Sequence, residues 1–246
     1  MLLLMAGALF SACNKDEDEE DTTPDPTPAA APSNPIPAPV GANGAFVAIQ
    51  TANYITTPLG TIYQPLGVGV SVYGDLAASS FQDAGTVTLN TKALTKQSNN
   101  SYVYTPAAAD VTGIEYDSGV NWSVGGNSST GAPQFAHTVS NSMPSGPNYT
   151  GSTTIARNAA FTLSSSEAIS GADSVIFNLI SPSGSVMKTV AGGTNAVTFS
   201  AAEMGGLGAG QGYLQIVPYN IESAVYSDKT LYFINETVLT KSVTFN

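Results

Sequence analysis

The chain has few residues capable of nucleophilic, redox or metal chemistry. Its 246 residues include a single cysteine, Cys13, and a single histidine, His137. One cysteine can form neither a disulfide within the chain nor a cysteine-based metal site. One histidine removes most histidine-based metal binding and acid–base catalysis in the same way. We therefore expect no metal ion and no cofactor.

Charged residues are also scarce, at 10 % of the chain against about a quarter in an average protein. The formal net charge is −11, and residues 14–25 alone contribute −6, because Lys15 is accompanied there by seven acids. The rest of the chain is only mildly acidic and has no basic patch. This charge distribution disfavours nucleic acid and anionic lipid headgroups as partners.

The N-terminal hydrophobic run is too short to cross a membrane as a helix, which takes about 20 apolar residues. It comprises the nine apolar or small residues Leu2–Phe10, and Ser11, Ala12 and Cys13 follow it. This length is typical of the hydrophobic region of a signal peptide. We expect residues 1–12 to be a signal peptide that is removed on export.

The segment around the cysteine resembles a known export system. Phe10-Ser11-Ala12-Cys13 is similar to the lipobox of bacterial lipoproteins, which implies that Cys13 carries the lipid and becomes the mature N-terminus. Stable anchoring takes more than one acyl chain, which such a modification supplies. The acidic run after it resembles the surface-export signal of Bacteroidetes-type lipoproteins. That signal would comprise Lys15, Asp16, Glu17, Asp18, Glu19 and Glu20.

This resemblance implies an outer-membrane protein that faces the extracellular medium. Seven prolines between positions 24 and 39 favour extended polyproline II and allow the segment to lift a folded domain roughly 60 Å off the membrane. We expect residues 13–43 to form a disordered, acidic and proline-rich tether.

The folded region reads as strands and turns. From Ala45 onward, apolar residues recur with period two and are interrupted by Gly, Asn and Pro, which predicts an all-β fold. Trp122 shares its parity with Val120 and Val124, so we expect it in the core. Between about Gln134 and Gly151 the alternation fails, which indicates a loop or an interdomain junction.

We therefore predict two antiparallel β-sandwich domains after the lipid-anchored tether, at residues 44–140 and 150–246. A single interlocked sandwich is the alternative. In the second half, Leu207 lies six residues before Tyr213, a spacing that resembles the tyrosine corner of immunoglobulin and fibronectin-III domains. The resemblance implies that the Tyr213 hydroxyl bonds back to the preceding loop. Ala201–Met204 is expected to form a short helical turn.

Candidates for chemistry are weak. No Gly-x-Ser-x-Gly elbow is present, and His137 lies in the predicted junction, where a plain surface residue is the expected role. Glu115 and Asp117, with Asp110 nearby, would share a strand face at a spacing compatible with calcium binding or a glycosidase pair. Any polar strand face shows the same pattern.

Aromatic residues are the remaining feature, since planar rings can stack on sugars. Four tyrosines lie in or beside predicted turns and are candidates for an exposed glycan-binding platform: Tyr54, Tyr63, Tyr73 and Tyr149.

The leading hypothesis is a non-enzymatic, lipid-anchored cell-surface protein with a role in adhesion, assembly or scaffolding. Its partners would be the membrane, through the lipid, and other surface proteins. The first alternative is a surface glycan-binding lipoprotein of a polysaccharide-utilisation system. An enzyme acting on polysaccharide, through Glu115 and Asp117, is the second.

Overall fold

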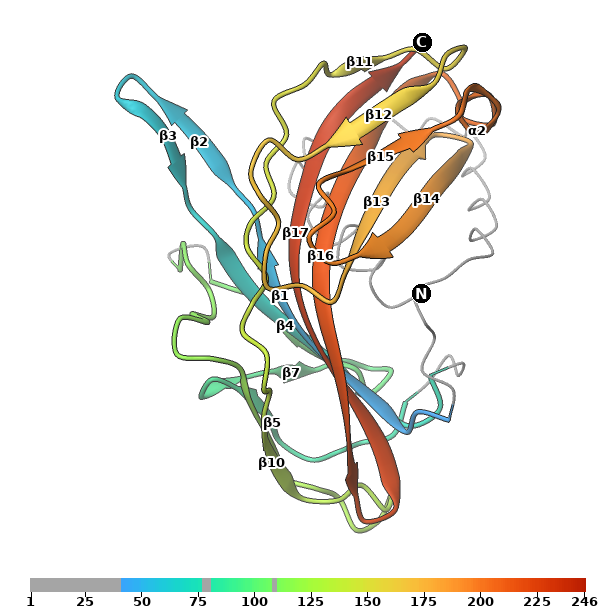
Figure 1. The fold of residues 1–246 in the computed structure, drawn as a ribbon. Coiled ribbons are helices and arrows are strands. Elements are labelled where there is room, and N and C mark those ends of the chain that lie inside the picture. Colours follow the sequence, from blue (N-terminus) through green and yellow to red (C-terminus); the bar gives the residue numbers. More distant parts are fainter. Residues whose placement is uncertain (1–40, 77–80, 108–109) are drawn as a thin grey trace, which may run out of the picture.

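The computed structural model describes residues 41–76, 81–107 and 110–246 (Figure 1). Strands account for nearly all of its regular structure, so the predicted all-β class is confirmed. The strands are Gly44–Thr51 (β1), Tyr54–Thr57 (β2), Gly60–Tyr63 (β3), Leu66–Tyr73 (β4), Val87–Leu89 (β5), Lys92–Ala93 (β6), Thr95–Lys96 (β7), Tyr102–Tyr104 (β8), Asn121–Val124 (β9), Phe135–Thr138 (β10), Thr154–Ile155 (β11), Phe161–Ser164 (β12), Ser174–Ser181 (β13), Gly184–Ala191 (β14), Ala196–Phe199 (β15), Gly210–Tyr226 (β16) and Lys229–Phe245 (β17).

One large sheet joins the two halves of the chain. Its strand order is β14-β13-β16-β17-β1-β4-β8-β7, with β11 also paired to β17. β1 and β17, which come from opposite ends of the described chain, run parallel, with Phe46 opposite Phe233. The sheet is strongly twisted, and the long β16–β17 hairpin extends along its whole height (Figure 1).

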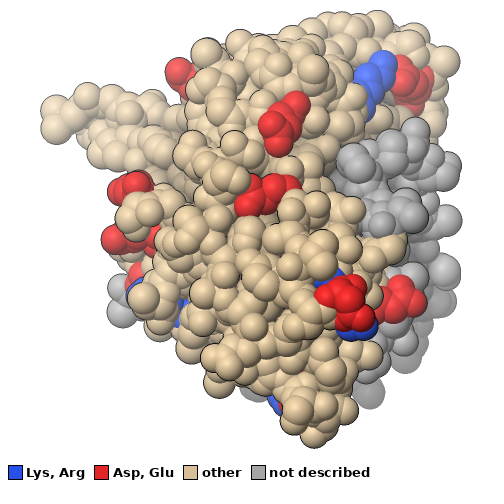
Figure 2. Space-filling view, turned by 60° about the horizontal axis from the view of Figure 1, so that its bottom comes forward, with Lys and Arg blue, Asp and Glu red and all other residues tan. Residues whose placement is uncertain are grey.

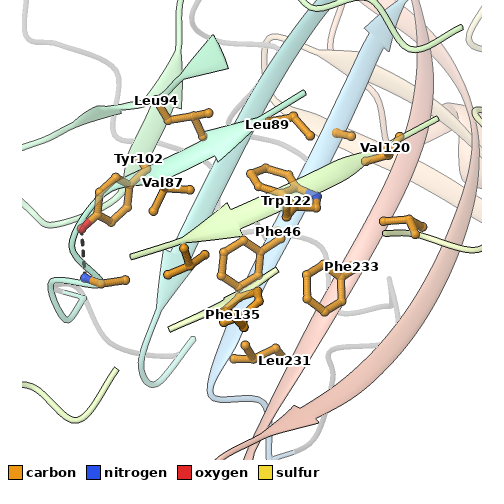
Figure 3. Close-up of a cluster of buried hydrophobic side chains, with 14 of the residues drawn as sticks. Phe46, Val87, Leu89, Leu94, Tyr102, Val120, Trp122, Phe135, Leu231 and Phe233 are labelled. Carbon is orange, nitrogen blue, oxygen red and sulfur yellow. Dashed lines mark hydrogen bonds between the residues drawn. The ribbon is translucent and has the colours of Figure 1, made fainter. Parts of the chain in front are cut away.

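Two apolar cores lie against the same face of this sheet. The first packs the large sheet against the four-stranded sheet β10-β9-β5-β6 (Figure 3). Trp122 is 1 % exposed there, as predicted, and its ring contacts Phe46 edge-on at 5.3 Å between centroids. The second core packs β13, β16 and β17 against the β12–β15 pair and the short helix α2, Ala201–Gly205.

Strand β17 belongs to both cores. Leu231 and Phe233 lie in the first, and Leu239, Val243 and Phe245 lie in the second. All five have odd numbers, so they share one face of the strand. The structure therefore does not confirm two separate sandwich domains, because a single sheet with two cores spans the predicted boundary.

The predicted junction is partly a strand and partly a connection across the sheet. Phe135–Thr138 forms β10, which the failed alternation did not reveal. The connection that follows lies on the large sheet between the two cores. Buried Asn235 donates to the Asn141 carbonyl and buried Thr237 to the Pro144 carbonyl, each at 2.7 Å. Polar side chains of β17 thus hold the connection where the apolar face is interrupted.

The second half confirms one local prediction and corrects another. α2 is the expected helical turn. The Ser200 hydroxyl accepts a hydrogen bond from the Glu203 N–H, and the Glu203 carboxylate accepts one from the Ser200 N–H, which together cap the helix. The tyrosine corner is wrong. Tyr213 lies within β16 at 43 % exposure, and no hydrogen bond from its hydroxyl is found among the described residues. Leu207 is buried in the second core.

A third apolar cluster occupies the opposite face of the large sheet. Every described member of this cluster is a residue of that sheet, and its buried members are Val47, Ile49, Val68, Ile176, Val217, Tyr219 and Ile234.

Candidate functional site

The residues of the predicted lipid anchor and export signal lie outside the described part of the chain. This applies to Cys13 and to Lys15–Glu20, as it does to most of the tether. Their roles remain predictions.

The structure separates the four candidate tyrosines into two groups. Tyr73 and Tyr149 are 2 % and 9 % exposed and belong to the first and second core, respectively. The expectation that they lie on the surface is wrong, because their apolar rings complete the cores. Tyr54 and Tyr63 lie opposite each other on β2 and β3, with 5.1 Å between ring centroids.

β2 and β3 form a ribbon that projects from the body, and we call residues 54–63 the arm (Figure 1). The arm continues the central β1–β4 hairpin in the same register, since Thr51 pairs with Leu66 and Tyr54 pairs with Tyr63. Gln64 N–H donates to the Asn53 carbonyl at 2.8 Å and bridges the two parts. Within the described chain, β2 and β3 pair only with each other.

One face of the arm is fixed to the body at its base. The Tyr54 hydroxyl donates to the Gly146 carbonyl at 3.0 Å, and Gln50 donates to the Tyr63 hydroxyl at 2.8 Å. A Cβ atom on Gly146 would lie 2.7 Å from the Tyr63 hydroxyl oxygen and 2.9 Å from its ring. The absence of a side chain at Gly146 therefore lets the Tyr63 ring lie on the backbone.

Burial at this contact also affects ionisation. Desolvation raises the pKa of Tyr54, and the neighbouring Tyr63 and Glu167 raise it further. Desolvation raises the pKa of Tyr63 against the opposing effect of the hydrogen bond from Gln50. Both phenols are therefore neutral hydrogen-bonding groups at ordinary pH.

The rest of the arm exposes apolar side chains. Ile55 and Ile62 pair across the ribbon and are 47 % and 55 % exposed, and Leu59 at the tip is fully exposed. No charged residue occurs between Ala45 and Gly74. The projection accordingly carries no Lys, Arg, Asp or Glu in the space-filling view (Figure 2). Exposed apolar residues grouped on a projecting element mark an interaction site more often than isolated ones do.

A hollow of about 310 Å³ lies at the base of the arm. Among its described lining residues only Lys241 is formally charged, and the others supply amide, hydroxyl, aromatic and aliphatic groups. The hollow is lined by Ala52, Asn53, Tyr54, Ile55, Gln64, Leu66, Val111, Thr240 and Lys241.

His137 lies in a strand and is well bonded, so the expectation of a plain loop residue is wrong. Its Nε2 lies 2.7 Å from the Glu222 carboxylate and its Nδ1 lies 2.9 Å from the Tyr226 hydroxyl. Its ring stacks on Phe233 at 3.7 Å. The Ser140 hydroxyl donates to the carboxylate of Glu222, not to the imidazole. The group ties β10 to the β16–β17 hairpin and does not place a serine on a histidine base.

Hydrogen bonds also determine the direction in which the pKa of Glu222 is shifted. Burial raises the pKa of its carboxyl, but the hydrogen bonds from Ser140 and His137 outweigh burial and hold the pKa below its usual range. Glu222 is therefore a carboxylate that accepts hydrogen bonds between the two elements.

The carboxylates expected on a strand face are not arranged that way. Glu115 and Asp117 are exposed and lie outside any strand. Asp110 instead accepts hydrogen bonds from the Tyr104 hydroxyl and the Gly113 N–H. No group of three or more potential metal ligands occurs within the described ranges.

The sequence pattern did not reveal a buried acid, Glu236. Glu236 in β17 has no exposed surface, and neither carboxylate oxygen has a hydrogen-bond partner among the described residues. It lies between Ile49 of β1 and Tyr219 of β16. Burial raises the pKa of Glu236 to about 8. Alternation alone does not distinguish a buried glutamate from a solvent-facing one.

The arm did have a sequence signal. Tyr54-Ile-Thr-Thr-Pro-Leu-Gly-Thr-Ile-Tyr63 reads nearly the same in both directions about Pro58 and Leu59. Such symmetry places Tyr opposite Tyr and Ile opposite Ile around a turn, which is the observed register.

No family model, curated protein or solved structure matches the chain. In the part of the chain that the structure describes, no helix combines the length and the apolar character needed to cross a membrane.

Proposed function

We propose that the chain is a lipid-anchored protein of the bacterial outer surface with a non-enzymatic role in assembly or adhesion. Cys13 would carry the anchor, residues 15–20 would direct export, and the tether would present the folded body to the medium. The other surface components that it holds would be proteins.

The observation that carries this proposal is the arm. It is an uncharged ribbon that projects from the centre of the large sheet and exposes Ile55, Leu59 and Ile62. Unpaired strand edges and exposed aliphatic groups are a template for contact with another polypeptide. Natural proteins usually protect such edges with charge or proline, and the only proline in the arm is at its tip.

Photo-crosslinking on intact cells tests this role. A benzophenone amino acid in place of Leu59 should give an adduct with a surface protein on irradiation. The same substitution at Val225, which is 66 % exposed outside the arm, should give none. Equal adducts at both positions, or none at position 59, would contradict the assembly role.

The anchor has an independent test. Cys13→Ala should abolish labelling with radioactive palmitate, and replacing residues 15–20 with alanine should reduce cleavage by protease added to whole cells. Unchanged labelling or unchanged cleavage would refute the corresponding step.

A glycan-binding role has one observation in its favour. Tyr54, Asn53 and Gln64 line the hollow at the base of the arm, which combines a ring with amide groups. The packing of Tyr54 and Tyr63 against each other and against Gly146 limits the ring surface left for a sugar. A glycan array should decide: binding that is lost in Asn53→Ala but retained in Leu59→Lys would favour this role.

A further inference from the structure

We propose that the arm pairs with the arm of a second copy of this chain. The two β3 strands would lie antiparallel and form a four-stranded sheet, with a twofold axis at Ile62. This inference rests on the proposed assembly role and names the partner.

Among the described strands, β3 has a free outer edge to which another strand can bind. β2 continues β1, whose other neighbour is β17. β3 continues β4, whose other edge is covered by β8 from Gly69 to Ser71 and by a bridge to Gly113 at Gly67, and no described strand pairs with the outer edge of Gly60–Tyr63. In Figure 1, β3 is accordingly the outer strand of the arm and β2 the strand on the body's side. A two-stranded ribbon is marginally stable alone, and further strands stabilise it.

The alternation of side chains sets the register. Residues directly opposite in an antiparallel pair share a face, so placing Ile62 opposite Ile62 of the second copy aligns both faces. Ile55 and Ile62 of the two arms would then form one row of four isoleucines. A slip of one residue would put Ile62 beside Thr61 and break the row.

This register also accounts for the exposed tip. With Ile62 on the axis, position 59 of one copy lies opposite position 65 of the other. Pro65 lies between Gln64 and Leu66, which line the hollow at the base of the arm. The fully exposed Leu59 of one arm would therefore lie beside Pro65 at the base of the second arm, and the Leu59 of the second copy would lie beside Pro65 of the first.

Charge supports a second copy as the occupant. Two chains of net charge −11 repel each other, and like charges brought into contact are costly. The arm and the strands that bear it, from Ala45 to Gly74, have no charged residue. Two copies can therefore meet here without opposing like charges, and a charged partner would find nothing to pair with.

Disulfide trapping tests the register in the full chain. All samples carry Cys13→Ser, so that the native thiol cannot cross-link. Ile62→Cys should give a disulfide-linked dimer under mild oxidation, because the axis places the two introduced thiols opposite each other. Ile55→Cys should remain monomeric on non-reducing gels, because the two copies of position 55 would lie on the outer strands of the four-stranded sheet. Val225→Cys, outside the arm, should also remain monomeric. Equal dimer yields at positions 62 and 225, or no dimer at position 62, would overturn the pairing.

A second set of variants tests the contact of the tip. In the Ile62→Cys background, Leu59→Lys should reduce the dimer yield severalfold, and Val225→Lys should leave it unchanged. An equal effect of the two lysines would overturn the contact between the tip of one arm and the base of the other. If Leu59→Lys instead abolished binding to phosphatidylcholine vesicles while no dimer formed, the arm would be a membrane contact and the pairing would be wrong.

The assembly role and the pairing of two copies can be refuted independently. A photo-adduct at position 59 with a different protein, together with no dimer for Ile62→Cys, would leave the assembly role standing and overturn the pairing of copies.

Discussion

At the residue scale, Glu236 makes stability depend on pH. Its carboxyl has a pKa of about 8 in the folded protein, against an ordinary value of 4.5. Between these values the unfolded chain releases a proton that the folded protein keeps. The free energy of unfolding therefore falls as pH rises, by about 1.4 kcal/mol per pH unit from this group.

Glu236→Gln should remove this dependence. In urea titrations from pH 5 to pH 8, the stability of the variant relative to the parent should increase steadily. Glu115→Gln, at an exposed position, is the matched control. A constant difference between Glu236→Gln and the parent would show that the carboxyl has an ordinary pKa when folded.

Two tyrosine hydroxyls should differ in their contribution to stability. The buried Tyr116 hydroxyl donates to the Val68 carbonyl, so Tyr116→Phe leaves a buried acceptor and should cost about 1–3 kcal/mol. Tyr213→Phe, at an exposed position, should change stability by less than about 0.5 kcal/mol. Urea unfolding of both variants checks these predictions. A larger loss of stability in Tyr213→Phe than in Tyr116→Phe would support the tyrosine corner.

Single residues were predictable where strand alternation decides their environment. Trp122 lies between two valines of the same parity and is in the core. Tyr73 and Tyr149 were misplaced because a position near a turn says little about burial when the ring packs under a second sheet. His137 was misplaced because its partners Glu222 and Tyr226 are more than 80 residues away in the sequence.

At the scale of the element, the arm is held by the contact of Tyr63 with Gly146. Gly146→Val would place side-chain atoms where the Tyr63 ring now lies. We expect faster hydrogen exchange in residues 54–63 and an unchanged rate in β13. Gly205→Val is the control, because a Cβ atom there meets nothing within 4 Å. Equal exchange in the arms of both variants would show that the contact does not hold the arm.

Element boundaries were less predictable than element type. β1, β4, β13 and β14 have eight residues each, an ordinary strand length. β16 and β17 have 17 residues each, because each strand serves two cores in succession. The middle of each strand is polar, and Asn220, Asn235 and Thr237 there bond to the connection between the cores. In the sequence these polar residues interrupt the apolar alternation, so one long strand reads as two short ones.

At the scale of the whole molecule, the shared sheet should make the two halves fold together. β1 lies between β17 and β4, so a fragment of residues 41–140 loses a strand beside Phe46. Residues 41–140 and 141–246 should each lack a cooperative unfolding transition alone and recover it on mixing. Cooperative unfolding of either fragment alone would instead support the two independent domains predicted from the sequence.

The sequence could predict the β class but not the sharing of one sheet, because the pairing of β1 with β17 joins residues almost 190 positions apart. No local pattern encodes that distance. The location of the protein depends on residues 1–40 and stays a prediction from their resemblance to lipoproteins.

The most direct test of the account concerns the arm as the contact through which this protein assembles. Residues 54–63 can be replaced by Asn-Gly, which joins Asn53 to Gln64 in a tight turn, in a full chain that carries Cys13→Ser. Sedimentation equilibrium should show a concentration-dependent dimer for the parent and a monomer for the variant, with similar urea midpoints for both. A dimer of undiminished affinity in the variant would contradict the account.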